Sequence, residues 1–182
     1  MATTKTYLGG KAELAFGTNV IEPDFLGSMT VNLEEGTRST TSLAGVISKP
    51  SGAYETAEIT GEFILPSMDA LKKLYAHIYT SGTNGGRVTF GGNTCNEQEP
   101  KTVNIHYTCE ADSANDFHAN AGVIKANFNV TYDTDGTLTV PFTILLQPDD
   151  DGEYGFAGAG DLTASKIWDA TTQSWVTPPI SG

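Results

Sequence analysis

Alternation of apolar and polar residues between positions 28 and 65 constrains the fold of this 182-residue chain more than any other feature. Met29, Val31 and Leu33 alternate with polar neighbours, and the same pattern returns over residues 57–65. Successive side chains of an extended strand point to opposite faces of a sheet. The segment therefore predicts a long β-hairpin with one apolar and one polar face. The polar face would carry Asn32, Glu34, Glu58, Thr60 and Glu62.

Residues 36–54, between the two halves of this hairpin, are expected to form an extended loop. They are polar and flexible at both ends, with an apolar segment, Leu43 to Ile47, in the middle. Loops longer than about 12–15 residues usually serve a function in compact domains. The apolar segment either folds back on its own core or docks on a neighbouring subunit, and the sequence leaves both possibilities open.

Further strands and a single helix follow from the same kind of pattern. The helix is predicted over 66–80, with Ser67 as its N-cap and Ser81-Gly82 at its end. Its apolar stripe should pack on the sheet, and consists of Met68, Leu71, Leu74, Tyr75 and Ile78. Strands are predicted over 11–20, 87–90, 101–110, 123–132 and 137–147, the last two joined by a tight turn at 133–136.

The composition supports a β-rich fold in one domain. Thr, Gly, Asn, Ser and Val outnumber the Leu, Glu and Lys of a helix bundle. Residues 1–10 are polar and small, and are predicted to be an arm or an edge strand. Residues 11–168 form the single expected domain, and 169–182 an irregular C-terminal tail.

The charge balance disfavours two classes of partner. Ten basic residues against 22 acidic ones give a net charge of −12. Proteins bind phosphate backbones tightly through Lys and Arg, which displace counterions, so tight nucleic-acid or anionic-membrane binding is disfavoured. The sequence shows no apolar run long enough to span a bilayer and no signal-peptide core, so synthesis and folding in a cytoplasm are expected.

Candidate metal and catalytic groups find little support. Cys95, His106, Cys109 and His118 lie near one another in sequence, but only His106 and Cys109 have a spacing typical of zinc ligands. We expect two reduced thiols and two surface imidazoles, with a Cys95–Cys109 bridge across a hairpin as the alternative if the protein meets an oxidant. The acidic segments 133–136 and 149–153 do not fit the twelve-residue calcium loop. No nucleophile elbow, zinc-protease motif or phosphate loop is present. The chain is therefore expected to be no enzyme and to hold no metal and no cofactor.

The arrangement of these features resembles the major tail tube proteins of long-tailed bacteriophages, and their relatives in contractile tails and type VI secretion. The resemblance covers roughly residues 11–167. It rests on the long hairpin with its 43–47 loop, on the helix opening Pro66-Ser67-Met68-Asp69-Ala70-Leu71, and on the paired strands around 133–136. It implies a β-sandwich or small barrel with one flanking helix, whose long hairpin joins an inter-subunit barrel.

The same resemblance implies how such a chain functions. Six-membered rings of the subunit stack into a hollow tube through which DNA passes without specific binding. The polar hairpin residues Asn32, Glu34, Glu58, Thr60 and Glu62 would line the lumen. Contacts between subunits or rings would involve Tyr7, Leu8, Leu43, Val46, Ile47 and Tyr54.

The resemblance also implies partners and a location. The partners would be further copies of the chain and the tape-measure, tail terminator and tail tip proteins, with no membrane involved. The protein would be made in the host bacterial cytoplasm and reside in the virion tail. The segments expected to drive assembly are residues 2–10, 36–54 and 149–161.

A second function class remains open at this stage. A carbohydrate- or surface-binding β-sandwich, such as an adhesin or a virion spike module, could use aromatic side chains as a sugar platform. The candidates for such a platform are Tyr79, Phe90, Trp168 and Trp175. Alternatively, the two tryptophans pin the C-terminal segment to the body. Ring or tube formation would discriminate the two classes.

Overall fold

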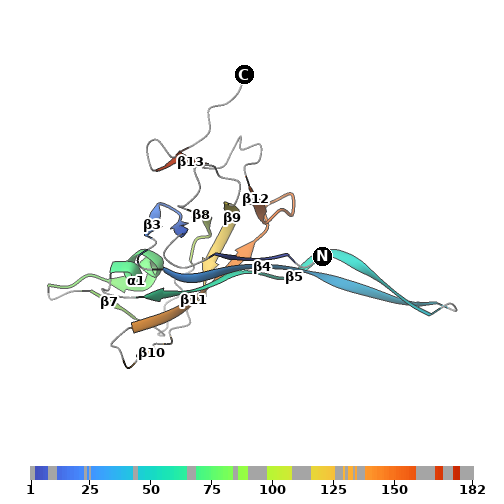
Figure 1. Cartoon of the computed structure of the whole chain (residues 1–182), viewed down its shortest axis with the longest axis horizontal. Coiled ribbons are helices and arrows are strands. Elements are labelled where there is room, and N and C mark those ends of the chain that lie inside the picture. Colours follow the sequence, from blue (N-terminus) through green and yellow to red (C-terminus); the bar gives the residue numbers. More distant parts are fainter. Residues whose placement is uncertain are drawn as a thin grey trace, which may run out of the picture.

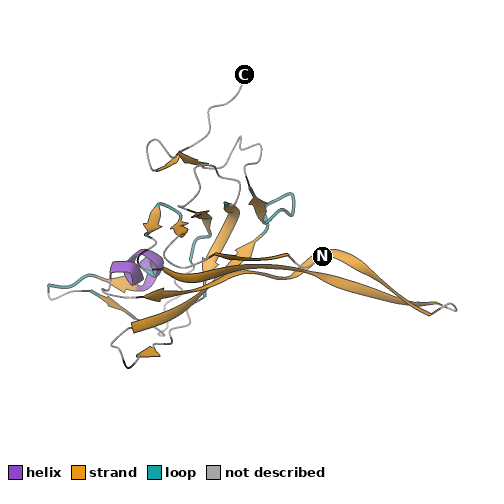
Figure 2. Ribbon diagram, in the orientation of Figure 1, coloured by secondary structure: helices purple, strands orange, loops and turns teal. Residues whose placement is uncertain are grey.

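Antiparallel β-strands account for most of the residues that the computed structural model describes, and the one α-helix among those residues is short and lies at the end away from a long projecting hairpin (Figures 1 and 2). The expected mainly β fold is thus confirmed. The structure describes residues 3–7, 12–22, 24, 26–42, 45–64, 69–83, 86–89, 98–107, 116–125, 129, 131–132, 134, 138–158, 167–169 and 174–176.

Ten strands form one large sheet, and two small ladders stand apart from it. The strands of the large sheet are β1 (Thr3–Tyr7), β2 (Ala12–Phe16), β3 (Asn19–Ile21), β4 (Leu26–Ser42), β5 (Gly45–Ile64), β8 (Lys101–Tyr107), β9 (Phe117–Ile124), β10 (Thr131–Tyr132), β11 (Leu138–Gln147) and β12 (Gly155–Ala157). Its main path runs β1-β4-β5-β11-β9-β8-β2-β3, with β10 beside β11 and β12 beside β9. Within the described strands, no pairing joins β1 to β3, so the sheet is open.

The projecting hairpin is longer than the sequence predicts. The expected loop over 36–54 is wrong, because β4 and β5 stay paired as far as Ser42 and Gly45. Nearly half of the residues in this segment are Thr, Ser, Val or Ile, and the β-branched ones among them suit extended backbone. Register shifts after Glu34 and Glu35 show where the ladder is irregular.

The N-terminal part of the prediction also changes. The described residues of the strand predicted over 11–20 belong to two strands, β2 and β3, rather than one. The chain reverses at Gly17, whose φ of 62° lies in the left-handed region that glycine adopts without a steric cost. Residues 3–7 form β1, which pairs with β4 over Met29 to Leu33, so the edge-strand alternative holds for them.

The helical segment is shorter than predicted. Residues 69–74 form α1 (Asp69–Leu74), a 3-10 turn η2 (Ala76–Ile78) follows, and Tyr79–Thr80 is strand β6, paired with β7 (Arg87–Val88). The predicted cap Ser67 and the stripe residue Met68 lie outside the described residues. Leu71, Leu74 and Tyr75 are fully buried, which confirms that the stripe packs on the sheet.

Strand boundaries in the second half differ from the prediction in one important place. β9 begins at Phe117 and ends at Ile124, so the predicted strand over 123–132 lies mostly beyond it. β10 does pair with β11 across the predicted turn at 133–136. The C-terminal tail over 169–182, expected to be irregular, contains β14 (Ser174–Val176), which pairs with β13 (Ile167–Asp169) at the end of the expected domain.

The core lies on the apolar face of the sheet. Met29, Val31, Ile59 and Phe63 of the hairpin are buried, as the alternation predicts. From β11 the buried residues are Val140, Phe142, Ile144 and Leu146. Phe63 and Phe142 pack with ring centroids 4.7 Å apart. Since α1 contributes Leu71 and Leu74 to the same cluster, the hairpin base is held rigidly against the body.

Candidate functional site

The polar face of the hairpin brings together all five residues that the sequence singles out for it. Asn32 of β4 stands opposite Glu58 of β5, and Thr30 stands opposite Thr60. Glu34 is opposite Thr56, one step further out. Directly opposed residues of an antiparallel pair share a face. The predicted grouping of Asn32, Glu34, Glu58, Thr60 and Glu62 on one face is therefore present.

This face is acidic and continues across neighbouring strands. Glu62 stands opposite Pro141 of β11, and its side chain lies over Gly27, where any Cβ would come within 2.3 Å of it. Thr4 of β1 donates a hydrogen bond of 3.4 Å to the Oδ1 of Asn32. Close to the body, over residues 30–34 of β4 and 56–62 of β5, the described side chains on this face include the carboxylates of Glu34, Glu58 and Glu62 but no Lys or Arg. This part of the face therefore repels an approaching anion.

Beyond residues 33 and 58 the hairpin becomes a two-stranded ribbon. β1 covers β4 only as far as Leu33, and β11 covers β5 only from Glu58. Outside those limits both edges of the ribbon lack a partner strand among the described residues. Isolated two-stranded ribbons are marginally stable in water, and open edges are templates for pairing with another chain.

A bulge marks the start of the ribbon. Glu35 stands opposite Tyr54 and Thr37 opposite Pro50, so residues 51–53 have only Gly36 across from them. Gly52 has a φ of 75°, and its N–H donates to Glu35 Oε1 at 2.8 Å. Bulges of this kind bend a strand and increase its twist. The bulge therefore sets the direction in which the ribbon leaves the body.

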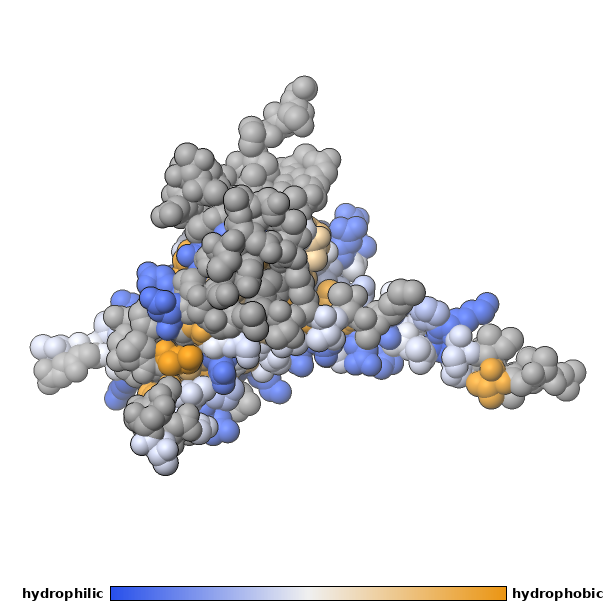
Figure 3. Space-filling model, viewed as in Figure 1, coloured by the Kyte–Doolittle hydropathy of each residue, from blue (hydrophilic) through white to orange (hydrophobic). Residues whose placement is uncertain are grey.

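The inter-subunit candidates are split between the two ends of the ribbon. Val46 is 68% exposed near its far end, where Figure 3 shows hydrophobic surface beside hydrophilic residues. The alternative that the apolar segment folds back on its own core is thus wrong for Val46. Tyr54, 42% exposed, lies at the base, with its ring 5.3 Å from that of Tyr154. Leu8 and Leu43, and the side chains of Tyr7 and Ile47, lie outside the described residues.

The acidic segment 149–153 is a turn held together by the side chain of Asp149. Asp149 Oδ1 accepts hydrogen bonds from the N–H groups of Asp151 and Glu153, at 3.1 and 2.8 Å. Its Oδ2 accepts one from Asn120 Nδ2 at 2.7 Å. These bonds occupy the Asp149 carboxylate, whereas Asp150 and Asp151 are exposed. The acidic turn (149–153) is therefore a rigid projection beside β12.

A buried polar network lies on β8 and β9, where the sequence predicts surface imidazoles. That prediction is wrong, because His106 is 1% and His118 6% exposed. His106 Nδ1 lies 2.9 and 3.0 Å from the two carboxylate oxygens of Asp116. His118 Nδ1 is hydrogen-bonded to Asn104 Oδ1, and its ring stacks on Phe156 with centroids 5.0 Å apart. The period-two pattern alone gives no sign that this polar face is covered.

Glu13 of β2 borders the network, opposite His106. Burial raises the pKa of the Glu13 carboxyl, an effect that His106 partly offsets and Glu22 reinforces. Burial lowers the pKa of His118, against a smaller opposing effect of a hydrogen bond with Asn120. The pKa of His77, on η2, is lowered by burial and by the nearby Lys101.

These shifts predict how stability depends on pH. The unfolded chain takes up protons on His77 and His118 near pH 6.5, while the folded chain resists protonation, so the free energy of unfolding falls as pH drops through that value. Each group contributes at most about 1.4 kcal/mol per pH unit. Glu13 has the opposite effect: at pH values between 4.5 and its raised pKa, the free energy of unfolding rises as pH drops. We expect His118→Gln to lose less stability than the wild type between pH 7.5 and 5.5, with a difference of at most about 1.4 kcal/mol per pH unit.

Differential scanning calorimetry across that pH range measures the effect. Adding His77→Gln to His118→Gln tests the second imidazole. This double variant should lose most of the pH dependence of stability that remains in His118→Gln. An unchanged slope in the double variant would show that other groups control the acid sensitivity.

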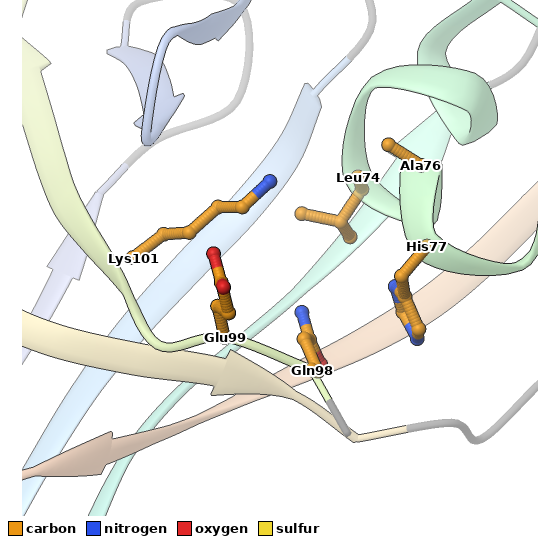
Figure 4. Close-up of a pocket in the computed structure, with 6 residues that line it drawn as sticks. All are labelled: Leu74, Ala76, His77, Gln98, Glu99 and Lys101. Atoms are coloured by element: carbon orange, nitrogen blue, oxygen red, sulfur yellow. The ribbon is translucent and has the colours of Figure 1, made fainter. Parts of the chain in front are cut away.

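A cavity of about 310 Å³ lies between α1–η2 and the start of β8. Figure 4 shows Leu74, Ala76 and His77 on its helical side, and Gln98, Glu99 and Lys101 on the other. Two of its polar groups already serve the fold. Gln98 Oε1 accepts a hydrogen bond from the Ile124 N–H at 3.0 Å, and Lys101 Nζ lies 5.7 Å from the centre of the Phe16 ring.

The aromatic residues of the alternative function class are only partly described. Lys72 Nζ lies 5.6 Å from the centre of the Tyr79 ring. Trp168 stands opposite Trp175 in the β13–β14 ladder, while their side chains and Phe90 lie outside the described residues.

Comparison with models of protein families and with curated proteins finds no match for this chain. The described residues include no group of three or more His, Cys, Asp or Glu placed to hold a metal ion. They also include no helix that is long and apolar enough to cross a membrane.

Proposed function

We propose that this chain is the structural subunit of a self-assembling hollow tube of the phage tail tube type. The observation that carries the proposal is the hairpin, which combines an acidic polar face with a ribbon whose edges have no partner strand among the described residues. The acidic face suits the wall of a water-filled channel, and the open edges of the ribbon suit contact with further copies.

In the proposed assembly, six subunits form a ring and the rings stack. The sheet of one subunit continues into that of its neighbour, so that the hairpins together close an inner barrel. The described sheet is open between β1 and β3, and closure across subunits would remove exposed strand edges. The body of each subunit, a small sandwich or barrel with α1 at its flank, would form the outer wall.

The proposed tube conducts DNA by avoiding contact with it. Every Lys or Arg in the wall would bind a phosphate and release counterions, which would add an energy barrier to sliding. Glu34, Glu58 and Glu62, repeated by every subunit, instead repel the phosphates. Within this proposal the protein resides in a virion tail, and its partners are its own copies and the tape-measure, tail terminator and tail tip proteins.

Cysteine labelling of assembled material tests the lumen assignment. Negative-stain electron microscopy first establishes that the purified chain forms rings or tubes of uniform width. In a background with Cys95→Ser and Cys109→Ser, Glu58→Cys is then treated with a maleimide polymer too large to enter the bore. We expect labelling to be at least about tenfold slower in tubes than in monomers, since a closed wall excludes the reagent.

Ser81→Cys is the matched control, because Ser81 is exposed at the α1 end of the body. It should label at similar rates in both states. Equal labelling of the two variants in tubes would contradict the lumen assignment. A chain that remains monomeric at high concentration, with or without an added tail initiator complex, would contradict the tube itself.

A further inference from the structure

Two cations face each other near the middle of the ribbon. Arg38 of β4 stands directly opposite Lys49 of β5, and both side chains are exposed. Like charges directly opposite in an antiparallel pair destabilise it. Neither side chain forms an ion pair with any residue that the structure describes. No ion pair within the described part of the chain therefore relieves the repulsion between the two cations.

This charge is unusual for the chain. Arg38 and Lys49 are the only charged residues between positions 36 and 54, whereas acidic residues outnumber basic ones by more than two to one overall. The next pairs outward, Ser39–Ser48 and Thr40–Ile47, are uncharged. Exposed Val46 lies three positions further out on β5, a spacing that places its side chain on the opposite face from Lys49. The far half of the ribbon thus carries a cationic pair on one face and an exposed apolar side chain on the other.

A complementary surface exists elsewhere on the same chain. Asp150 and Asp151 are exposed on the acidic turn (149–153), whose shape is fixed by the Asp149 hydrogen bonds. In Figure 1 this turn lies beside β12 on the body, while the ribbon extends away from it. No described ion pair joins the two within one chain. Each surface is therefore free to meet its complement on another copy.

We infer that the ribbon of one copy docks head-to-tail on a second copy, with Arg38 and Lys49 against Asp150 and Asp151 of its acidic turn. Because the two surfaces differ, the contact is heterologous, and such contacts repeat into rings or open filaments. The pairing also neutralises the repulsion between the opposed cations. The inference deepens the proposed tube function and rests on it for the final architecture.

The cations have a simpler alternative role. Charged residues on an open strand edge discourage unwanted pairing, and Arg38 and Lys49 could serve only as such a guard. Charges of either sign prevent unwanted edge pairing, whereas docking requires the opposite charge on the partner surface. Charge reversal separates the two roles.

The experiment uses two variants of the full chain, Arg38→Glu with Lys49→Glu, and Asp150→Lys with Asp151→Lys. The first has two acidic surfaces and the second two basic ones. Neither should assemble alone, and we expect the concentration needed for assembly to rise at least about tenfold for each. Mixed in equal amounts they should co-assemble, since each ribbon then meets a turn of opposite charge. Sedimentation velocity and electron microscopy measure both effects.

Lys72→Glu with Lys73→Glu is the matched control, because it reverses two neighbouring cations on α1 and changes the net charge by the same amount as the ribbon variant. It should assemble as the wild type does. Circular dichroism confirms that each variant is folded before it is assayed.

The outcomes separate the inference from the function on which it rests. Assembly by the mixture, and by neither folded variant alone, supports the pairing. If the ribbon variant assembles like the wild type, or the mixture stays dispersed while wild-type tubes form, the pairing is wrong and the tube stands. If wild-type tubes never form but the mixture associates in sedimentation, the pairing stands and the tube is wrong.

Discussion

Replacing residues 38–49 with an Asn-Gly turn is expected to produce a stable, folded monomer that no longer assembles. Thr37 and Pro50 stand opposite each other in the ladder, so a two-residue turn can join them. The removed segment lies beyond the strands β1 and β11 that hold the hairpin base. We expect the free energy of unfolding to change by less than about 1 kcal/mol, while tubes disappear from electron micrographs.

Insertion of two glycines after Ser81, in an exposed loop near α1, is the control for a change of loop length. It should affect neither stability nor assembly. Tubes formed by the truncated chain would show that the ribbon is no connector. Loss of folding would show that the ribbon stabilises the body, contrary to its place outside the packed sheet.

Phe142→Ala is expected to lower the free energy of unfolding by about 4 kcal/mol, because it leaves a cavity that the surrounding sheet cannot close. Phe142 is 2% exposed and packs on Phe63 with ring centroids 4.7 Å apart. It also fills the space over Gly61, where a Cβ would lie 2.7 Å from its Cζ. Such a loss is a large part of the about 5–15 kcal/mol that keeps a domain folded.

Leu145→Ala, on the same strand, is the matched control. Leu145 faces the opposite side of the sheet and is 40% exposed, so its truncation should cost less than about 1 kcal/mol. Urea unfolding followed by circular dichroism measures both variants. Equal losses for the two would mean that the assignment of the core face of β11 is wrong.

The candidate face was predictable because its cause is local. Alternation along a strand follows from backbone geometry alone, so Glu58, Thr60 and Glu62 share a face wherever the strand lies. The helix stripe was predictable for the same reason, and Leu71, Leu74 and Tyr75 are buried. The length of the helix was not, because Tyr79 and Thr80 pair with β7 instead of continuing it.

Predictions failed where the answer depended on distant parts of the chain. Residues 36–54 were expected to be a loop because they are polar, yet they pair across the ribbon. His106 was expected at the surface because it alternates with Ile105, yet Asp116 and burial on the second face of the sheet make it part of the interior. A polar residue on an alternating strand is exposed only if nothing covers that face of the sheet. Whether the face is covered depends on segments that are distant in the sequence.

The mainly β character, the two faces of the hairpin and the amphipathic stripe of α1 follow from the spacing of residues along single segments, and the sequence therefore predicts them. The pairing of the strands, the place of the bulge at 51–53 and the opposition of Arg38 and Lys49 become known only from the folded chain. Register and burial result from contacts between segments far apart in the chain. No local pattern specifies those contacts.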